Sequence, residues 1–227
     1  MADLKLYADS TWMSPWAFHA LVALEEKGLP YELEAVPMPI PPATKAKLVE
    51  HAVFGKVPVL VDRRPEGDRW IAESLAISEY LAESFPFPDH PRLFPADLGA
   101  RARARQILSF CRTTMFGLRE DRPTGSVFGR PVDKPLSARG KADADELLRI
   151  AAAFINPGSG SKSRPLHSRP KQSLFGDWCI ADADFTLLLM RLIANQDPVP
   201  QPIVDYALAQ WDRKSVRRYL SHMPTMT

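Results

Sequence analysis

The first 85 residues contain short segments whose apolar positions predict strands. Residues 4–7 alternate with a period of two, which is typical of a strand. Further strands are predicted at 31–36, at the β-branched run 57–61 and at 69–71. Pro58 lies inside the third segment, and because proline donates no ladder hydrogen bond, we expect a strand start, an edge or a bulge there.

Three helices are predicted between and after these strands. The first carries its own boundary signals, with Ser14 as N-cap, Pro15 at the first helical position and Gly28 just past the end. A short polar helix is predicted near 43–51, and a third helix from Leu75 to about Phe85, with Ser74 as its cap. The resulting order is β-α-β-α-β-β-α.

Proline positions limit where long helices can form. The chain has 22 prolines in 227 residues, roughly double the usual share. A proline in a helix interior costs about 3 kcal/mol. The proline-free windows of the second half therefore predict an all-helical region, and they are 96–122, 136–156, 171–197 and 203–223.

A domain boundary is predicted near residue 90. Four prolines between 85 and 95 exclude a helix and predict a semi-rigid linker. The charge changes at the same place, from a net −5 over 1–95 to a net +7 over 96–227. We therefore predict an α/β domain at 1–85, a proline-rich linker at 86–95 and an all-helical domain at 96–227.

Composition and charge exclude several classes of protein. With 45% apolar and 25% charged residues, the chain fits neither a disordered nor a membrane protein. The longest uncharged apolar run, 16–24, is shorter than the ~18 residues that a membrane span needs. The basic residues form no module that reads nucleic acid, so no nucleic-acid partner is predicted.

Cysteine and histidine usage predicts no metal site. Cys111 and Cys179 have no C-x-x-C spacing, and the five histidines have no metal-ligand spacing. A distant cysteine pair suggests a reducing compartment. The N-terminal residues do not match a signal peptide, and we predict a soluble, cytoplasmic protein.

Three short motifs carry candidate chemistry. Ser14 opens a helix directly after the first strand, where N–H groups and the helix dipole favour a bound thiolate to which the hydroxyl donates. Val57 precedes Pro58 in a predicted cis peptide, which offers a bare backbone edge to an extended ligand. Glu73 and Ser74 at a helix start suit the ammonium and the carboxylate of one amino acid.

These motifs, in this order, resemble those of the soluble glutathione S-transferase superfamily. Residues 4–85 resemble its thioredoxin-like domain and 96–223 its all-helical domain. The motifs at 14–16, 23–28, 56–60 and 73–77 are similar to the serine-type, tau-like classes. The stretches 101–107, 119–124 and 175–182 look more specifically like the bacterial YfcF-type branch.

The resemblance implies an α/β thioredoxin-like N-terminal domain, an all-α C-terminal domain and a homodimeric glutathione transferase that acts in detoxification. Ser14 would stabilise the thiolate of glutathione, the co-substrate, for attack on a small hydrophobic electrophile. The other implied contacts to glutathione are Lys56 at the glycyl carboxylate, Val57 and Pro58 at the cysteinyl group, and Glu73 and Ser74 at the γ-glutamyl end.

The electrophile is expected in a pocket between the two domains, where ligand sites often form. The residues expected there are Trp12, Met13 and Trp16 from the first loop, and Cys111, Arg112, Met115, Phe116 and Arg119 from the second domain. Apolar residues at helical spacing also suit a protein core, which is the alternative for this set.

Alternative functions remain open. The same thiolate would serve a glutathione-dependent peroxidase acting on organic hydroperoxides, and the same fold would serve a non-catalytic glutathione-binding module. A serine hydrolase using Ser14 and His19 is disfavoured because the G-x-S-x-G elbow is missing.

Three features depart from the family pattern. His19 stands where tau-like sequences usually carry arginine, and it either tunes Ser14 or has a plain core or surface role. Cys179 stands where the family has a Ser or Thr cap before Asp182, which predicts that half of a capping box is missing. Residues 156–172 are expected to form a surface insertion, with a mobile lid as the alternative.

Overall fold

The computed structural model describes residues 3–155 and 172–223. Residues 156–171, which include most of the expected surface insertion, therefore lie outside the described residues. The chain divides into two compact units. One contains the residues up to Leu93 together with the segment from Lys214, and the other is Phe94–Arg213.

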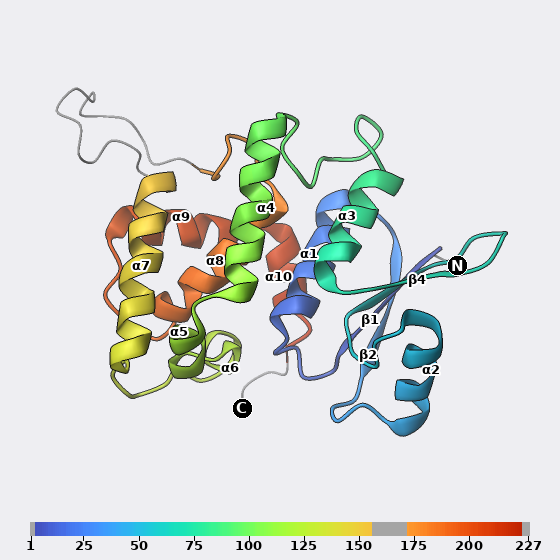
Figure 1. The fold of residues 1–227 in the computed structure, drawn as a ribbon, viewed down its shortest axis with the longest axis horizontal. Coiled ribbons are helices and arrows are strands. Elements are labelled where there is room, and N and C mark those ends of the chain that lie inside the picture. The colour runs from blue at the N-terminus through green and yellow to red at the C-terminus, as the bar shows by residue number, and fades with distance from the viewer. Residues whose placement is uncertain (1–2, 156–171, 224–227) are drawn as a thin grey trace. The chain divides into compact units, whose positions relative to one another are not determined.

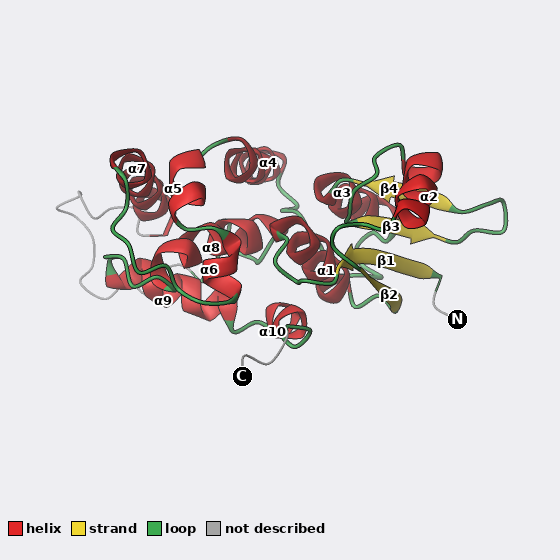
Figure 2. Ribbon diagram, turned by 90° about the horizontal axis from the view of Figure 1, so that it is seen from below, coloured by secondary structure: helices red, strands yellow, loops and turns green. Residues whose placement is uncertain are grey.

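The first unit is built on a four-stranded sheet in the order β2-β1-β3-β4 (Figures 1 and 2). The strands are β1 (Leu4–Asp9), β2 (Tyr31–Val36), β3 (Val59–Asp62) and β4 (Arg69–Ala72). β1 runs parallel to β2 and antiparallel to β3, and β3 is antiparallel to β4. β3 begins one residue after Pro58, as expected for a residue that donates no backbone hydrogen bond.

Different helices cover the two faces of this sheet. Tyr7 and Val59 pack with Leu48 of α2 (Pro42–Ala52) in one apolar cluster. Successive residues of a strand point to opposite faces. Leu6 and its register partner Leu60 therefore lie on the other face, beside α1 (Pro15–Lys27) and α3 (Ser74–Ser84). The element order up to α3 is the predicted one.

The last helix, α10 (Lys214–Leu220), belongs to the first unit although it comes from the far end of the sequence. It packs on α1 (Figure 1), and its Val216 and Tyr219 are buried. The apolar face of α10 thus groups this helix with the α/β unit in the structure. The predicted domain limits, 1–85, 86–95 and 96–227, stay a prediction.

The second unit is helical throughout its described regular elements. They are α4 (Leu98–Thr113), α5 (Phe116–Asp121), α6 (Thr124–Phe128), α7 (Ala138–Ile155), α8 (Ile180–Ile193) and α9 (Gln201–Trp211). α8 is the centre, because almost every residue along it is buried and it contacts α4, α6 and α9. The long helices lie in the predicted windows, except that α9 carries Pro202 in its first turn, where proline is tolerated.

The N-terminus of α8 corrects one expectation. Both contacts of a capping box are present, because the Cys179 side chain meets the backbone of Asp182 and Oδ2 of Asp182 accepts from the Cys179 N–H at 2.9 Å. The predicted missing half is therefore wrong, since a thiol sulfur serves as a weak acceptor. Oδ1 of Asp182 also accepts from the Leu174 N–H and the Tyr206 hydroxyl, both at 2.8 Å.

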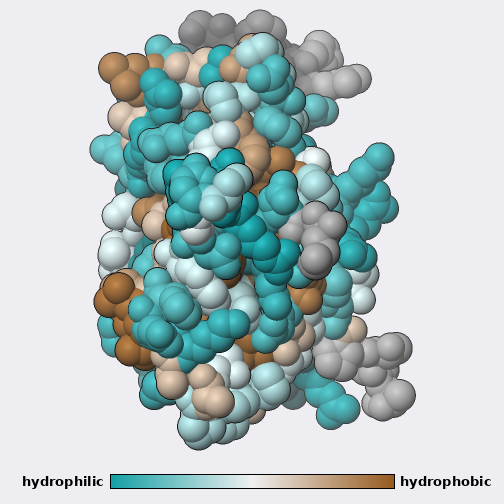
Figure 3. Space-filling view, turned by 90° about the vertical axis from the view of Figure 1, so that its right-hand side faces the viewer, coloured by the Kyte–Doolittle hydropathy of each residue, from teal (hydrophilic) through white to brown (hydrophobic). Residues whose placement is uncertain are grey.

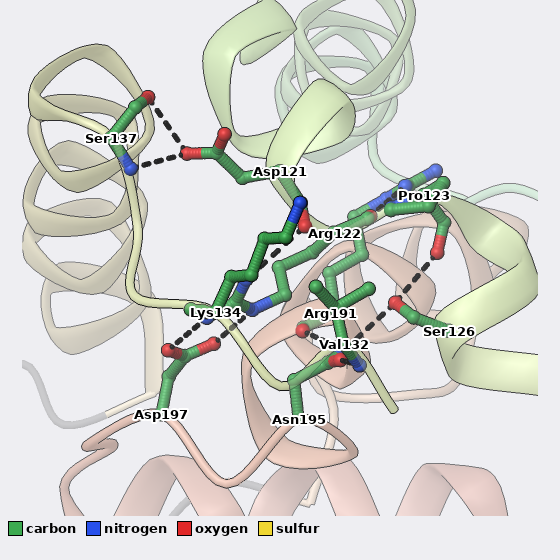
Figure 4. A network of polar contacts seen from close by, with 10 residues as sticks. All are labelled: Asp121, Arg122, Pro123, Ser126, Val132, Lys134, Ser137, Arg191, Asn195 and Asp197. Atoms are coloured by element: carbon green, nitrogen blue, oxygen red, sulfur yellow. Dashed lines mark hydrogen bonds and ion pairs between the residues drawn. The ribbon is translucent and has the colours of Figure 1, made fainter. Parts of the chain in front are cut away.

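A polar network joins the end of α5 to the segment after α8 (Figure 4). Arg122 donates to the carboxylate of Asp197 and, through Nη2, to the carbonyl oxygen of Lys134 at 2.8 Å. Oδ2 of Asp121 accepts from the N–H and the hydroxyl of Ser137, both at 2.8 Å. The acidic and basic residues of the motif at 119–124 thus contribute structural contacts.

The surface shown in Figure 3 is mainly hydrophilic, with small hydrophobic areas. The exposed large apolar side chains of the first unit include Met38, Val49, Val53 and Phe54, which lie on or beside α2. Among the described residues, no helix is both long enough and apolar enough to cross a membrane.

Candidate functional site

The N-terminus of α1 presents Ser14 as its cap. The backbone of Ser14 is extended, with φ −78° and ψ 120°, and Pro15 follows at the first helical position. The hydroxyl oxygen accepts from the N–H groups of Trp16 at 3.3 Å and Ala17 at 3.2 Å. Because both contacts are accepted, the hydroxyl proton remains available to donate to a ligand. This local geometry is the one that the Ser14, Pro15 and Gly28 signals predict.

A cavity of about 170 Å³ lies between the start of α1, the loop before β3 and the start of α3. Its lining residues are Trp16, Phe54, Lys56, Val57, Pro58, Ala72, Glu73 and Ser74. All five residues expected to bind the body of glutathione are therefore together in one cavity. Ser14 is absent from the lining, but Trp16, whose N–H it accepts, is part of it.

The Val57–Pro58 peptide at this cavity is cis, as the sequence analysis predicted. Pro58 is buried, while Lys56 is exposed at the cavity and leaves a cation available to a ligand carboxylate. Phe54 and Ala72 also line the cavity. Neither residue was expected from the sequence, because neither belongs to one of the motifs. Phe54 is a half-exposed apolar residue.

Glu73 and Ser74 lie where β4 passes into α3. Glu73 has a positive φ of 67° and an exposed side chain, and its carbonyl oxygen accepts from the Ile77 N–H at 2.9 Å. Left-handed backbone in a residue other than glycine clusters at functional sites. Ser74 is buried as the first residue of α3. The pair thus offers a carboxylate beside a helix N-terminus, which matches the two charged groups of an amino acid.

The residues expected to hold the electrophile divide between the two units. Trp16 lines the cavity described above, whereas Trp12 is buried and lines a different cavity of about 670 Å³ together with Tyr31 and His222. Met13, which follows Trp12 in the loop before α1, is partly exposed.

The other five come from the second unit. Cys111 and Arg112 lie on α4, Phe116 and Arg119 lie on α5, and Met115 is the N-cap of α5. Arg112 forms an ion pair with Asp184, and Nη1 of Arg119 donates to the Arg112 carbonyl oxygen at 3.0 Å. Burial lowers the pKa of Arg119, and the nearby Arg112 lowers it further. Met115 is buried and Phe116 is exposed. The prediction that both sets line one pocket stays a prediction.

Three groups outside the cavity have structural positions. His19 is fully buried on α1, which is a core position. Cys111 and Cys179 are free and buried, and burial raises the pKa of both thiols, so neither is a thiolate at neutral pH. Within residues 3–155 and 172–223, no cluster of three or more His, Cys, Asp or Glu side chains could hold a metal ion.

Two family models match the chain. The model for the glutathione S-transferase C-terminal domain matches residues 97–224, and the model for the N-terminal domain matches residues 13–84. Because the first alone covers more than half of the chain, the chain belongs to the glutathione S-transferase family. This confirms the predicted family and the predicted combination of a thioredoxin-like domain with a helical domain.

Curated relatives match over part of their length. Glutathione S-transferase U13 of Arabidopsis thaliana is 35% identical over 95 residues, which are 42% of this chain and 39% of the relative. The probable glutathione S-transferase GSTU1 of Oryza sativa subsp. indica is 29% identical over 164 residues, which are 66% of this chain and 64% of the relative. The chain thus spans less than two thirds of these relatives.

Solved structures match along nearly the whole chain. A glutathione transferase homologue from Burkholderia GL BGR1, solved with bound glutathione, is 31% identical with a TM-score of 0.71, covering 96% of both chains. A tau class glutathione S-transferase from mango, Mangifera indica, has a TM-score of 0.68 at 20% identity, covering 96% of this chain and 92% of its own. The second comparison bears on the fold alone.

Proposed function

We propose that the protein is a glutathione transferase that joins the sulfur of glutathione to small electrophiles. Ser14 donates a hydrogen bond from its hydroxyl group to the thiolate, which lowers the pKa of the bound thiol. The thiol proton leaves to solvent, the thiolate attacks an electrophilic carbon, a C–S bond forms, and the leaving group departs with its electron pair. The observation that carries this proposal is the position of the Ser14 cap on the helix whose Trp16 lines the cavity.

The same proposal places glutathione along the cavity. The γ-glutamyl ammonium binds Glu73, its carboxylate meets Ser74 and the N-terminus of α3, and Lys56 meets the glycyl carboxylate. The cysteinyl backbone pairs with Val57. The Burkholderia homologue with bound glutathione supports the ligand, since it is 31% identical over 96% of this chain.

The finer assignment is also part of the proposal. The serine-type, tau-like class rests on the motifs at 14–16 and 73–77. The YfcF-type branch rests on the stretches 101–107, 119–124 and 175–182. We include a homodimer and a cytoplasmic location in the same proposal on the strength of the resemblance.

The test compares Ser14→Ala with Asp97→Ala. Both remove a helix N-cap, because Oδ1 of Asp97 accepts from the Ala100 N–H at 2.7 Å on α4, but only the first touches the proposed site. We expect S14A to lower kcat/KM for an aromatic electrophile by about 10²-fold, the scale for one lost donor to a developing anion. D97A is expected to change only the melting temperature.

Further arms separate the alternatives. Millimolar glutathione must raise the melting temperature, since a ligand well above its Kd stabilises the fold it binds, and no rise would refute the co-substrate. Retention on immobilised glutathione without turnover of any electrophile would point to a binding module. Turnover of an organic hydroperoxide, measured in parallel, decides between transferase and peroxidase chemistry.

A further inference from the structure

The peptide group between Trp12 and Met13 is held at both of its ends. Its N–H, on Met13, donates to Oδ2 of Asp9 at 3.1 Å. Its carbonyl oxygen, on Trp12, accepts from the hydroxyl of Tyr219 at 2.9 Å. The same hydroxyl lies 3.2 Å from the carbonyl oxygen of Ser14, so the backbone on both sides of Met13 is tied to one phenol.

The two side chains that hold this peptide are themselves fixed. Asp9 ends β1 and is 3% exposed, and its Oδ2 also accepts from the Thr11 hydroxyl at 2.5 Å. Tyr219 on α10 is fully buried. Its ring meets Trp12 and Phe18 edge to face, with centroids 5.6 Å and 5.2 Å apart.

Backbone strain marks the same loop. Trp12 has a φ of 57°, in the left-handed region that bulky side chains disfavour. Such a conformation persists only where the surroundings over-determine it. The hydrogen bonds from Tyr219 and to Asp9 act on the peptide that follows Trp12, and therefore supply that constraint.

Tyr219 remains a donor at physiological pH. Burial raises the pKa of its phenol, and the carboxylate of Asp9 raises it further. The hydroxyl therefore keeps its proton. The ring of His222 stacks on the ring of Trp12, with the two centroids 4.6 Å apart.

We propose that Asp9 and Tyr219 are positioning residues for Ser14, forming a clamp on the Trp12–Met13 peptide that sets where the serine hydroxyl stands. This inference rests on the proposed role of Ser14 in binding the glutathione thiolate. Ser14 is the residue directly after Met13. A shift of the clamped peptide therefore moves the Ser14 hydroxyl relative to the sulfur of glutathione. The two residues touch neither glutathione nor the electrophile and act through the loop.

The variants Tyr219→Phe and Asp9→Ala each remove one of the two hydrogen bonds that hold the Trp12–Met13 peptide. Y219F keeps the ring and loses only the donor. Asp9→Asn is the conservative rescue, because the amide oxygen still accepts from Met13 and Thr11. The matched control is Tyr206→Phe, which removes another buried phenol hydroxyl, bonded to Asp182 in the other unit at 2.8 Å.

The decisive readout is the pKa of the glutathione thiol in the binary complex, followed by thiolate absorbance during a pH titration. We expect Y219F and D9A to raise it and to lower kcat/KM about tenfold near neutral pH, since small displacements of a reacting group have effects of this size or larger. The difference in kcat/KM between these variants and the wild type is expected to narrow as the pH rises, because the bound thiol then ionises in all of them. The Kd for the thiol form of glutathione, measured below the pKa of the bound thiol, should stay within about twofold, because the contacts to the tripeptide are unchanged.

The outcomes separate the clamp from the proposed function. If S14A raises the thiol pKa while Y219F and D9A leave it unchanged, the clamp is refuted and the role of Ser14 stands. If S14A leaves the thiol pKa unchanged, the role of Ser14 fails and the clamp fails with it. Y219F that only loses thermal stability, as Y206F is expected to do, overturns the inference, and so does a D9N variant as impaired as D9A.

Discussion

The side chain of Arg122 meets the carboxylate of Asp197 through two hydrogen bonds, from Nε to Oδ2 at 2.8 Å and from Nη2 to Oδ1 at 2.9 Å (Figure 4). The two side chains are only 3% and 12% exposed. The hydrogen bond to Asp197 raises the pKa of Arg122. This bidentate pair ties the end of α5 to the segment that leaves α8.

Removal of one partner of this pair should destabilise the fold strongly. Asp197→Ala leaves a buried guanidinium without its carboxylate, which costs about 3–5 kcal/mol. The exposed pair of Arg149 and Glu146 on α7 is the control, and Arg149→Ala is expected to leave the free energy of unfolding almost unchanged, because solvent screens an exposed ion pair. Urea unfolding measures both. Equal losses in the two variants would contradict the prediction.

A close approach of α5 and α7 depends on Gly117. A Cβ at this position would lie 2.8 Å from the backbone carbon of Arg139 and 2.9 Å from the nitrogen of Gly140. Gly117→Ala must therefore push the helices apart, at a cost of roughly 1–3 kcal/mol. Gly125→Ala on α6 meets nothing within 4 Å and is the matched control. Calorimetric melting of both variants tests this, and a neutral G117A would show that the helices separate freely.

Glu73 should matter for glutathione affinity and little for stability. Its side chain is exposed at the cavity, where it is proposed to take the γ-glutamyl ammonium. Glu73→Gln removes the charge and is expected to weaken binding about tenfold or more, the size of one charge-assisted hydrogen bond. Glu83→Gln changes an exposed carboxylate at the other end of α3 and serves as control. Isothermal titration with glutathione gives both Kd values, and an unchanged E73Q would remove Glu73 from the site.

His222 should make the folded protein less stable at mildly acidic pH than at neutral pH. Burial lowers the pKa of His222, and Arg218 lowers it further. Because the unfolded chain then binds the proton more tightly, this contribution to stability is present above pH ~6.5 and is lost as the pH falls through the folded-state pKa. The melting temperature of the wild type should drop more between about pH 7.5 and 5.5 than that of His222→Gln. Parallel pH profiles for the two proteins would contradict this assignment.

Local signals account for the parts of the site that the sequence predicts. The start and end of α1 follow from Ser14, Pro15 and Gly28, whose effects act within one helical turn. These boundaries depend only on neighbours along the chain. The family resemblance, and not a local signal, implied that the motifs around Val57 and Glu73 share one ligand, and the structure places both in one cavity.

Long-range packing accounts for what the sequence did not predict. The hydrogen bond from Tyr219 to Trp12, in the loop before Ser14, joins residues 207 positions apart, and no pattern near either residue indicates it. The grouping of α10 with the first unit has the same origin. Phe54 and Ala72 line the cavity through the packing of loops and strand ends, which side-chain type alone does not reveal.

The distance in sequence between Ser14 and Tyr219 has a consequence for how the protein is made. At about 5–20 residues per second, a ribosome needs on the order of 10–40 s to advance the 205 positions from Ser14 to Tyr219. The sheet and α1 are synthesised early, yet the loop before Ser14 gains its second hydrogen-bond partner only when α10 emerges. A nascent chain that is still being translated therefore has the strands of its ligand-binding unit before it has the fully restrained serine.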